Sequence, residues 1–214
     1  MSKEELRSTR LTASARRAQL VEVGRAVFAE RGYEASSVEE IAERAKVSKP
    51  IVYEHFGGKE GLYAVVVDRE MERVVAIISD AISSGAPRER LEQAALAFLT
   101  YVKDEPDGFA VLTRDAPVTT ASGGMSGLLN EVADRVGSVF AAAFKEAGFD
   151  QKAAPIYAHA LVGMVTFVGQ WWTESRKPGV DQVASHLAAL AWMGLRHLPR
   201  KPELSIEKRK RSKE

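Results

Sequence analysis

The fold of this chain is decided by the stretch Ser36-Ser-Val-Glu-Glu-Ile-Ala-Glu-Arg-Ala-Lys-Val-Ser-Lys-Pro-Ile-Val-Tyr-Glu-His-Phe56. It predicts two short helices joined by a tight turn, with a long third helix after Gly57-Gly58-Lys59. This is the pattern of a helix-turn-helix. The second helix of such a motif most often enters the major groove of DNA.

Each of the two short helices has a local start signal. Ser37 and Glu40 form a capping box, in which the Ser37 hydroxyl accepts from the amide three residues on and the Glu40 side chain reaches back to the Ser37 amide. Apolar residues then recur at helical spacing and predict one buried face: Val38, Ile41, Ala42 and Ala45. Ser48 is a second N-cap, and Pro50 falls in the first turn, where its missing amide is harmless.

The second helix leaves an outward or sideways face that a hydrophobic core would not need: Lys49, Pro50, Ile51, Tyr53 and His55. A lysine at a helix N-terminus suits phosphate. Tyr53 and His55 can donate hydrogen bonds to backbone oxygens of DNA, and Pro50 and Ile51 can contact thymine methyl groups. The alternative is a small helical subdomain with a solvated face, which Ile51 and Tyr53 together disfavour.

Two stretches resemble a known family. The run Ser48-Lys-Pro-Ile-Val-Tyr-Glu-His-Phe-Gly-Gly-Lys-Glu-Gly-Leu62 is similar to the signature of the tetracycline-repressor (TetR) family of bacterial transcription regulators. The upstream run from Arg17 to Tyr33 resembles the family's first helix and its Gly-aromatic end. The resemblance is specific from about Ser14 to Leu62, and beyond that it is one of general helical layout.

The resemblance implies roles for single residues. Ser37 and Lys59 occupy positions that contact phosphate, Lys49, Pro50 and Ile51 positions that read bases, and Tyr53 and His55 positions that grip the DNA backbone. The family usually has Gly in the turn, where this chain has Lys46, and a left-handed turn costs a non-Gly residue about 1 kcal/mol. The predicted DNA-binding set is Ser37, Lys46, Ser48, Lys49, Pro50, Ile51, Tyr53, His55 and Lys59.

The amino-acid composition limits the classes of protein to which this chain can belong. The 214 residues are 45% hydrophobic, enough for a good core, and contain no cysteine, which excludes a disulfide framework and thiolate metal ligands. His55, His159, His186 and His197 are scattered, so no metal site and no cofactor are expected. We see no apolar run near the ~20 residues of a membrane span and no signal peptide, so the prediction is a bacterial cytoplasmic protein without a membrane partner.

The formal net charge is only +1, so the distribution of charge matters more than its sum. The N-terminal arm is basic, and such arms can reach along DNA; its cations are Lys3, Arg7, Arg10, Arg16 and Arg17. The tail Glu207–Glu214 is also basic. It is either a solvated disordered segment or an additional non-specific contact with DNA.

The remaining sequence predicts helices throughout, hence an all-α protein of about nine helices with no internal repeat. The first runs from about residue 14 to 31, the fourth begins near residue 59, and breaks at 84–87, 104–106 and 118–124 separate those that follow. We expect three parts: residues 1–58 with the arm and helix-turn-helix, 59–198 as a helical effector-binding and dimerisation domain, and 199–214 as a tail.

The last two long helices are unusually apolar and predict a four-helix interface with a second chain, as the resemblance also implies. An ordinary intrachain core is the alternative. The predicted dimer residues are Ala160, Gly163, Met164, Val183, Leu187, Leu190 and Gly194. The resemblance implies an effector pocket in the body, and its candidate lining is Tyr101, Phe109, Phe140, Phe144, His159, Phe167 and Trp171, although such residues are more often plain core.

The sequence therefore predicts a dimeric regulator, most simply a repressor that binds a palindromic operator in double-stranded DNA and is released by an unknown small molecule. Two other classes stay open. One is a DNA-binding architectural protein without effector control. The other is an all-helical enzyme, against which stands the lack of paired carboxylates on an apolar face, of a Ser/His/Asp arrangement and of a phosphate-binding Gly loop.

Overall fold

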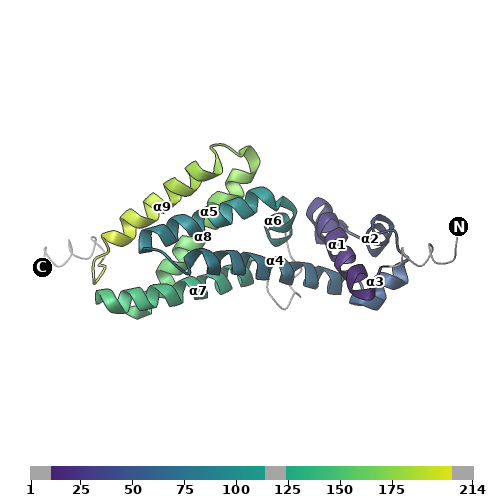
Figure 1. Cartoon of the computed structure of the whole chain (residues 1–214), viewed down its shortest axis with the longest axis horizontal. Coiled ribbons are helices and arrows are strands. Elements are labelled where there is room, and N and C mark those ends of the chain that lie inside the picture. Colours follow the sequence, from purple (N-terminus) through teal and green to yellow (C-terminus); the bar gives the residue numbers. More distant parts are fainter. Residues whose placement is uncertain (1–10, 114–123, 204–214) are drawn as a thin grey trace, which may run out of the picture. The chain divides into compact units, whose positions relative to one another are not determined.

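The computed structural model describes residues 11–113 and 124–203. These residues form nine α-helices and one short 3₁₀ helix, with no strand among them, so the predicted all-α fold is confirmed (Figure 1). The predicted arm residues Lys3, Arg7 and Arg10, the loop 118–123 and the basic tail lie outside the described residues.

Two compact units make up the chain. Unit 1 comprises Met1–Ala76 and Asp104–Leu128, and unit 2 comprises Ile77–Lys103 and Leu129–Glu214. The boundary therefore falls inside the fourth helix, and the chain returns to unit 1 between the fifth and sixth helices. The expected division at residue 59 follows the sequence motif and stays a prediction, whereas the units follow contacts in space.

Unit 1 contains α1 (Ala13–Ala35), α2 (Val38–Arg44), α3 (Lys49–Phe56), most of α4 (Lys59–Ile82) and α6 (Pro106–Thr113). Helix α1 packs on α2 and α6, and α2 packs on α3. The core is made of fully buried aliphatic and aromatic residues, among them Leu20, Val27, Phe28, Ile41, Val52 and Leu62. The helical spacing of these residues along each element explains why the helices form one core.

Helix α1 is interrupted at Gly32, directly after residue 31, where its end was expected. Its N-cap is Thr12, whose hydroxyl accepts from the Ala15 amide at 3.1 Å. Gly32 has φ 78° and ψ 170°, a backbone that other residues rarely adopt, so the helix is kinked at this residue and continues to Ala35. The kink brings Tyr33 against Phe28 and Tyr63, with ring centroids 6.3 Å and 4.9 Å apart.

Helix α6 is fixed to unit 1 at both of its ends. At its start, Glu105 accepts a hydrogen bond from Arg25 Nη1 at 2.8 Å and pairs with Arg73 at 3.1 Å. Arg25 also pairs with buried Glu70 at 3.1 Å. At the other end, the Tyr63 hydroxyl donates to the Val111 carbonyl at 3.4 Å. These contacts explain why α6 belongs to unit 1 although α5 before it does not.

Unit 2 contains the last turns of α4, α5 (Pro87–Asp104), most of α7 (Gly124–Ala147), the 3₁₀ turn Gln151–Ala153, α8 (Ala154–Ser175) and α9 (Val180–Arg196). A Cβ atom at Gly169 of α8 would lie 3.1 Å from the Phe98 ring of α5, so the two helices approach closely there. Trp172 is buried, and its Nε1 donates to the Pro178 carbonyl at 2.7 Å. Asp150 caps the 3₁₀ turn rather than α8 itself.

Helix α8 bears on the expectation that the chain has no membrane-spanning segment. The stretch Gln151–Ser175 is long and apolar enough to cross a membrane by length and composition alone, with a mean hydropathy of 1.2 in its best window. Its apolar residues are interrupted by Pro155, His159, Thr166 and Gln170, which hides the run in the sequence. Only 17% of that window is buried within the chain, so much of α8 is uncovered.

Candidate DNA-binding surface

The turn between α2 and α3 closes with the left-handed residue that the sequence placed at Lys46, whose φ is 55°. The Lys46 amide donates to the Glu43 carbonyl at 3.0 Å, and the Val47 amide donates to the Ala42 carbonyl at 2.9 Å. These two bonds are those of a Schellman motif, which satisfies the last carbonyl groups of a helix. The bonds stabilise a turn that costs a lysine about 1 kcal/mol of backbone strain.

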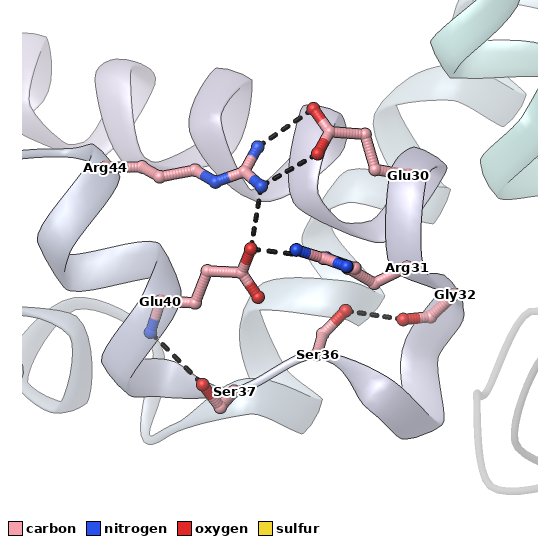
Figure 2. A network of polar contacts seen from close by, with 7 residues as sticks. All are labelled: Glu30, Arg31, Gly32, Ser36, Ser37, Glu40 and Arg44. Atoms are coloured by element: carbon pink, nitrogen blue, oxygen red, sulfur yellow. Dashed lines mark hydrogen bonds and ion pairs between the residues drawn. The ribbon is translucent and has the colours of Figure 1, made fainter.

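The predicted capping box at the start of α2 forms only in part. The Glu40 amide donates to Ser37 Oγ at 3.1 Å, as expected. The Glu40 side chain does not turn back to the Ser37 amide, because its carboxylate accepts from Arg44 Nη2 at 2.7 Å and pairs with Arg31 Nε at 3.5 Å (Figure 2). The capping pattern involves only Ser37 and Glu40, so it could not indicate that Arg31 and Arg44 compete for the Glu40 carboxylate.

The same cluster fixes α2 against α1. Arg44 donates to both oxygens of Glu30, at 2.9 Å and 2.7 Å, in a paired arrangement that Figure 2 shows. These hydrogen bonds lower the pKa of the Glu30 carboxyl. The Ser36 hydroxyl donates to the Gly32 carbonyl at 2.5 Å, at the kink of α1. A two-point contact between guanidinium and carboxylate specifies orientation as well as distance, so the cluster sets the angle of α2.

The outward face of α3 is open to solvent. Lys49 and Pro50 are exposed, Tyr53 is 54% exposed, and Ile51 and His55 are half-buried, whereas Val52 is fully buried. Ser48 has the extended backbone of an N-cap, but its hydroxyl makes no capping bond to the described first turn of α3. The predicted residues of α3 thus lie where a ligand of unit 1 could reach them.

Lys59 has a role that the resemblance did not imply. Its Nζ donates to the carbonyls of Tyr33, Ser36 and Glu34 at 2.9, 3.2 and 3.4 Å, and it lies 4.2 Å from the centre of the Tyr33 ring. An ammonium group has three donors, and three carbonyl oxygens occupy them here. In this conformation Lys59 stabilises the end of α1 and has no donor left for phosphate.

Two residues of α1 that the sequence did not single out for this role hold the ends of α2 and α3. Arg17 Nη1 donates to the His55 carbonyl at 2.6 Å, and its guanidinium lies 4.4 Å from the centre of the Phe56 ring. Gln19 Nε2 donates to the Ala45 carbonyl at 3.2 Å. Arg17, counted among the cations of the arm and also inside the expected first helix, lies in α1 and positions α3. Its partner is 38 residues away, so no local signal could identify it.

The predicted effector residues lie in both units and differ in exposure. Phe109 is buried in α6 of unit 1, and Tyr101 is buried in α5 of unit 2. Phe140 and Phe144 meet, with ring centroids 6.1 Å apart. The other three are exposed side chains on α8, with Phe167 at 74% and Trp171 at 55%: His159, Phe167 and Trp171. The three residues on α8 therefore face solvent rather than the interior of unit 2.

The predicted dimer residues also divide. Ala160, Leu190 and Gly194 are exposed, and Gly163 and Met164 are half-buried. Val183 and Leu187 are buried at 5% and 7% exposure inside unit 2, so these two belong to the intrachain core of α9. A single apolar stripe on α9 was expected from the sequence. It has a buried edge and an exposed edge.

Comparison with known proteins places this geometry in a family. A profile of bacterial regulatory proteins of the tetR family matches residues 20–66, which span most of α1 through α3 and the start of α4. A profile of the tetracyclin repressor-like C-terminal domain matches residues 87–194, which span α5 to α9. The chain belongs to the TetR family. TetR-family proteins are transcription regulators that bind DNA, and this activity is what the chain shares with them.

Relatives in the TetR family agree along most of the chain. The HTH-type transcriptional activator FasR of Mycolicibacterium smegmatis is 30% identical over 203 residues, which cover 90% of this chain and 89% of FasR. The HTH-type transcriptional repressor KstR2 of Mycobacterium tuberculosis is 34% identical over 85 residues, which cover 39% of this chain and 42% of KstR2. These relatives are named as regulators rather than enzymes.

Solved TetR-like structures share the fold. A TetR-like transcriptional regulator from Rhodococcus sp. RHA1 matches with a TM-score of 0.71 and 30% identity, covering 88% of this chain and all of that chain (100%). The fatty acid degradation regulator FadR from Bacillus halodurans matches with a TM-score of 0.72 at 18% identity, covering 86% of this chain and 97% of FadR. The second similarity concerns the fold alone.

Proposed function

We propose that this TetR-family protein is a dimeric repressor that binds a palindromic operator and is released by a small molecule. The observation that carries the proposal is the outward face of α3, where Lys49, Pro50 and Tyr53 are exposed beside buried Val52. A helix held firmly from behind with polar and apolar groups in front suits the major groove.

The residues of this surface divide by chemistry. Pro50 and Ile51 offer apolar contacts to bases, and Lys49 offers a cation to a base edge or a phosphate. Tyr53 and His55 offer hydrogen bonds to the DNA backbone, which position a protein without reading sequence. Further phosphate contacts are proposed for Ser37, Lys46 and Ser48, whereas Lys59 is no longer included because its donors are engaged.

Dimerisation is proposed through an uncovered apolar face of α8 and α9. Its large exposed side chains are Ile156, Phe167 and Trp171 on α8, and Leu190 and Met193 on α9. A Cβ atom added at Gly163 or Gly194 would meet nothing within 4 Å, so both glycines leave space on this face. An apolar patch of this kind marks an interface, and two copies of one face can pair about a two-fold axis. We therefore move Phe167 and Trp171 from the pocket to this face.

A two-fold dimer has a direct consequence for its DNA site. The half-sites of the operator would be inverted repeats with centres about one helical turn apart, or ~34–36 Å. Because operator DNA lies in the bacterial cytoplasm, we propose that the protein is located there. An effector would bind the aromatic interior of unit 2, near Phe140 and Phe144, and would favour the conformation that does not bind DNA.

Activation of transcription is a second candidate for what the protein does at its operator. FasR, matched along most of the chain, is named an activator, whereas KstR2, matched over a shorter part, is named a repressor. Activation is therefore the alternative to repression. Transcription from the operator-bearing promoter with purified polymerase separates them: added protein lowers transcript yield if it represses and raises it if it activates.

The decisive test of the proposal is selection of bound duplexes from a random DNA library. A palindromic consensus is expected. Recovery without any consensus would favour the architectural alternative and overturn sequence-specific regulation. Incubation of the protein with candidate effectors tests the enzyme alternative at the same time, because a regulator returns its ligand unchanged and an enzyme would turn it over.

A further inference from the structure

An ion pair lies on the outward side of the helix-turn-helix. Glu39 is in the first turn of α2, and Lys49 is the first residue of α3; their Oε1 and Nζ atoms are 2.5 Å apart. The side chains are 60% and 53% exposed, respectively. The hydrogen bond from Lys49 holds the pKa of the Glu39 carboxyl below its usual value of 4.5, so Glu39 is charged at neutral pH.

The fold does not need this pair. Ion pairs between exposed side chains contribute little to stability, because solvent screens them and holding two long side chains costs entropy. Helices α2 and α3 are held together by packing and by buried Ile41, Ala45 and Val52. Any role of Glu39 therefore lies in binding a partner at this surface and not in stabilising the fold.

A carboxylate is unusual on a surface that meets phosphates. Beside DNA it is repelled by the backbone and loses water, unless a base provides a hydrogen-bond donor. In the major groove, the amino group of cytosine N4 is the donor that glutamate accepts from, and lysine donates to guanine O6 and N7. Together Glu39 and Lys49 present one acceptor and one donor, which complement cytosine and guanine.

We propose that Glu39 is a specificity-determining residue that acts with Lys49, by accepting a hydrogen bond from a cytosine amino group and by penalising DNA that offers none at that position. The proposal rests on the proposed function, since it needs the outward face of α3 to read DNA. It adds a residue of α2 to the reading surface and names the base that this residue requires.

The variant Glu39→Gln tests the charge without changing the shape. Glutamine keeps the length of the side chain but lacks the charge, so DNA without the cytosine should be penalised less. Glu43→Gln is the matched control, because Glu43 is another exposed carboxylate of α2 and its loss changes the net charge equally. Both variants and the unchanged full-length chain are measured against the selected operator, all of its single-base-pair substitutions and an unrelated duplex, in one buffer.

With Glu39→Gln, discrimination at one G·C pair of each half-site should fall about ten-fold, and affinity for the unrelated duplex should rise. Glu43→Gln should change all affinities by a common factor. If Glu39→Gln also acts by a common factor, Glu39 contributes only bulk charge and the inference is wrong. If the unchanged chain yields no consensus at all, the proposed function fails and the inference fails with it.

A second measurement tests the partnership with Lys49. Lys49→Gln and the double variant complete a cycle with Glu39→Gln on the operator and on the duplex substituted at that pair. Residues that act as a unit give effects that do not add. We expect the double variant to lose less discrimination than the sum of the two single losses, whereas simple additivity would overturn the paired reading.

Discussion

Lys59 stabilises the carboxyl end of α1 through three backbone carbonyls. The last carbonyls of a helix lack partners within it and carry partial negative charge, so a cation placed among them is favourable. Arg17 makes the same kind of contact with the end of α3 through the His55 carbonyl. Lys59 and Arg17 therefore stabilise the positions of helices within the DNA-binding unit.

Replacing Lys59 with Met keeps most of the length of the side chain and removes the donors. We expect unit 1 to lose about 1.5–3 kcal/mol of stability, the range for hydrogen bonds to a charged group. Hydrogen exchange of α1 amides measures this, because the chain's three tryptophans, Trp171, Trp172 and Trp192, all lie in unit 2 and fluorescence would report the wrong unit. Lys152→Met, in an exposed position of unit 2, is the control. Unchanged exchange with weakened DNA binding would favour a phosphate contact for Lys59 instead.

Two substitutions distinguish the contact to the DNA backbone proposed for Tyr53 from the base reading proposed for Ile51. Tyr53→Phe removes only a hydroxyl, so affinity should fall by a similar factor on every DNA sequence. Ile51→Ala should relax preference at one base position, by roughly 1–3 kcal/mol if that base is read through its methyl group. Affinities for the operator and its single-base-pair variants measure both. Uniform effects from both substitutions would remove Ile51 from the base-reading residues.

At the scale of elements, α6 shows how a short helix is assigned to a unit. It begins just after Glu105, which accepts from Arg25 and pairs with Arg73. Unit 1 resumes at Asp104, the last residue of α5. The hydrogen bond from Arg25 lowers the pKa of the Glu105 carboxyl from its usual 4.5. The carboxylate form is therefore favoured by folding.

This lowered pKa gives a dependence of stability on pH with a definite sign. Because the folded pKa lies below the unfolded value of 4.5, the stabilisation from Glu105 is present above about pH 4.5 and is lost as the pH falls through the folded value. Unit 1 of the unchanged chain should therefore lose more stability between about pH 6 and about pH 3 than the Glu105→Gln variant. Hydrogen exchange of α1 and α6 at both pH values measures the difference.

The control for that experiment is Glu92→Gln. Glu92 forms an exposed pair with Arg88 on α5, at 2.8 Å, and exposed pairs contribute little to stability. Its removal should leave the acid loss of unit 1 unchanged. Equal acid losses in the unchanged chain and in Glu105→Gln would show that Glu105 does not hold α6 in place.

The elements also show what could be predicted from the sequence. The start of α2 was predictable because the signal of the Ser37 cap is local, whereas the left-handed turn at Lys46 was implied by the family resemblance. The roles of Lys59 and Arg17 were not predictable, because their partner carbonyls come from segments 26 and 38 residues away. Sequence periodicity predicts the apolar face of α9, but it cannot show which edge of that face packs against the rest of the same chain and which edge stays exposed.

At the scale of the whole molecule, α8 and α9 leave an apolar face that one copy of the chain does not cover. Leu190→Glu places a charge on this face, where Leu190 is 65% exposed. We expect the variant to sediment as a monomer and to bind a palindromic operator much more weakly, because two linked heads bind more tightly than one. Sedimentation velocity measures the first effect and a mobility-shift titration the second.

The matched control is Leu96→Glu. Leu96 is a leucine of α5 that is 38% exposed, so the same change of charge falls on another helix of unit 2. This variant should keep the mass of the unchanged chain. A dimer that survives Leu190→Glu would place the interface elsewhere.

The engagement of Lys59 and Arg17 with backbone carbonyls affects the thermodynamics of DNA binding. Each phosphate that a protein cation neutralises releases counterions from DNA, so affinity falls with ionic strength in proportion to the number of such contacts. Two cations near α3 are occupied inside the protein, and a third, Lys49, faces a carboxylate. We therefore expect these three cations to release few ions from DNA, so that operator occupancy changes little with ionic strength through them.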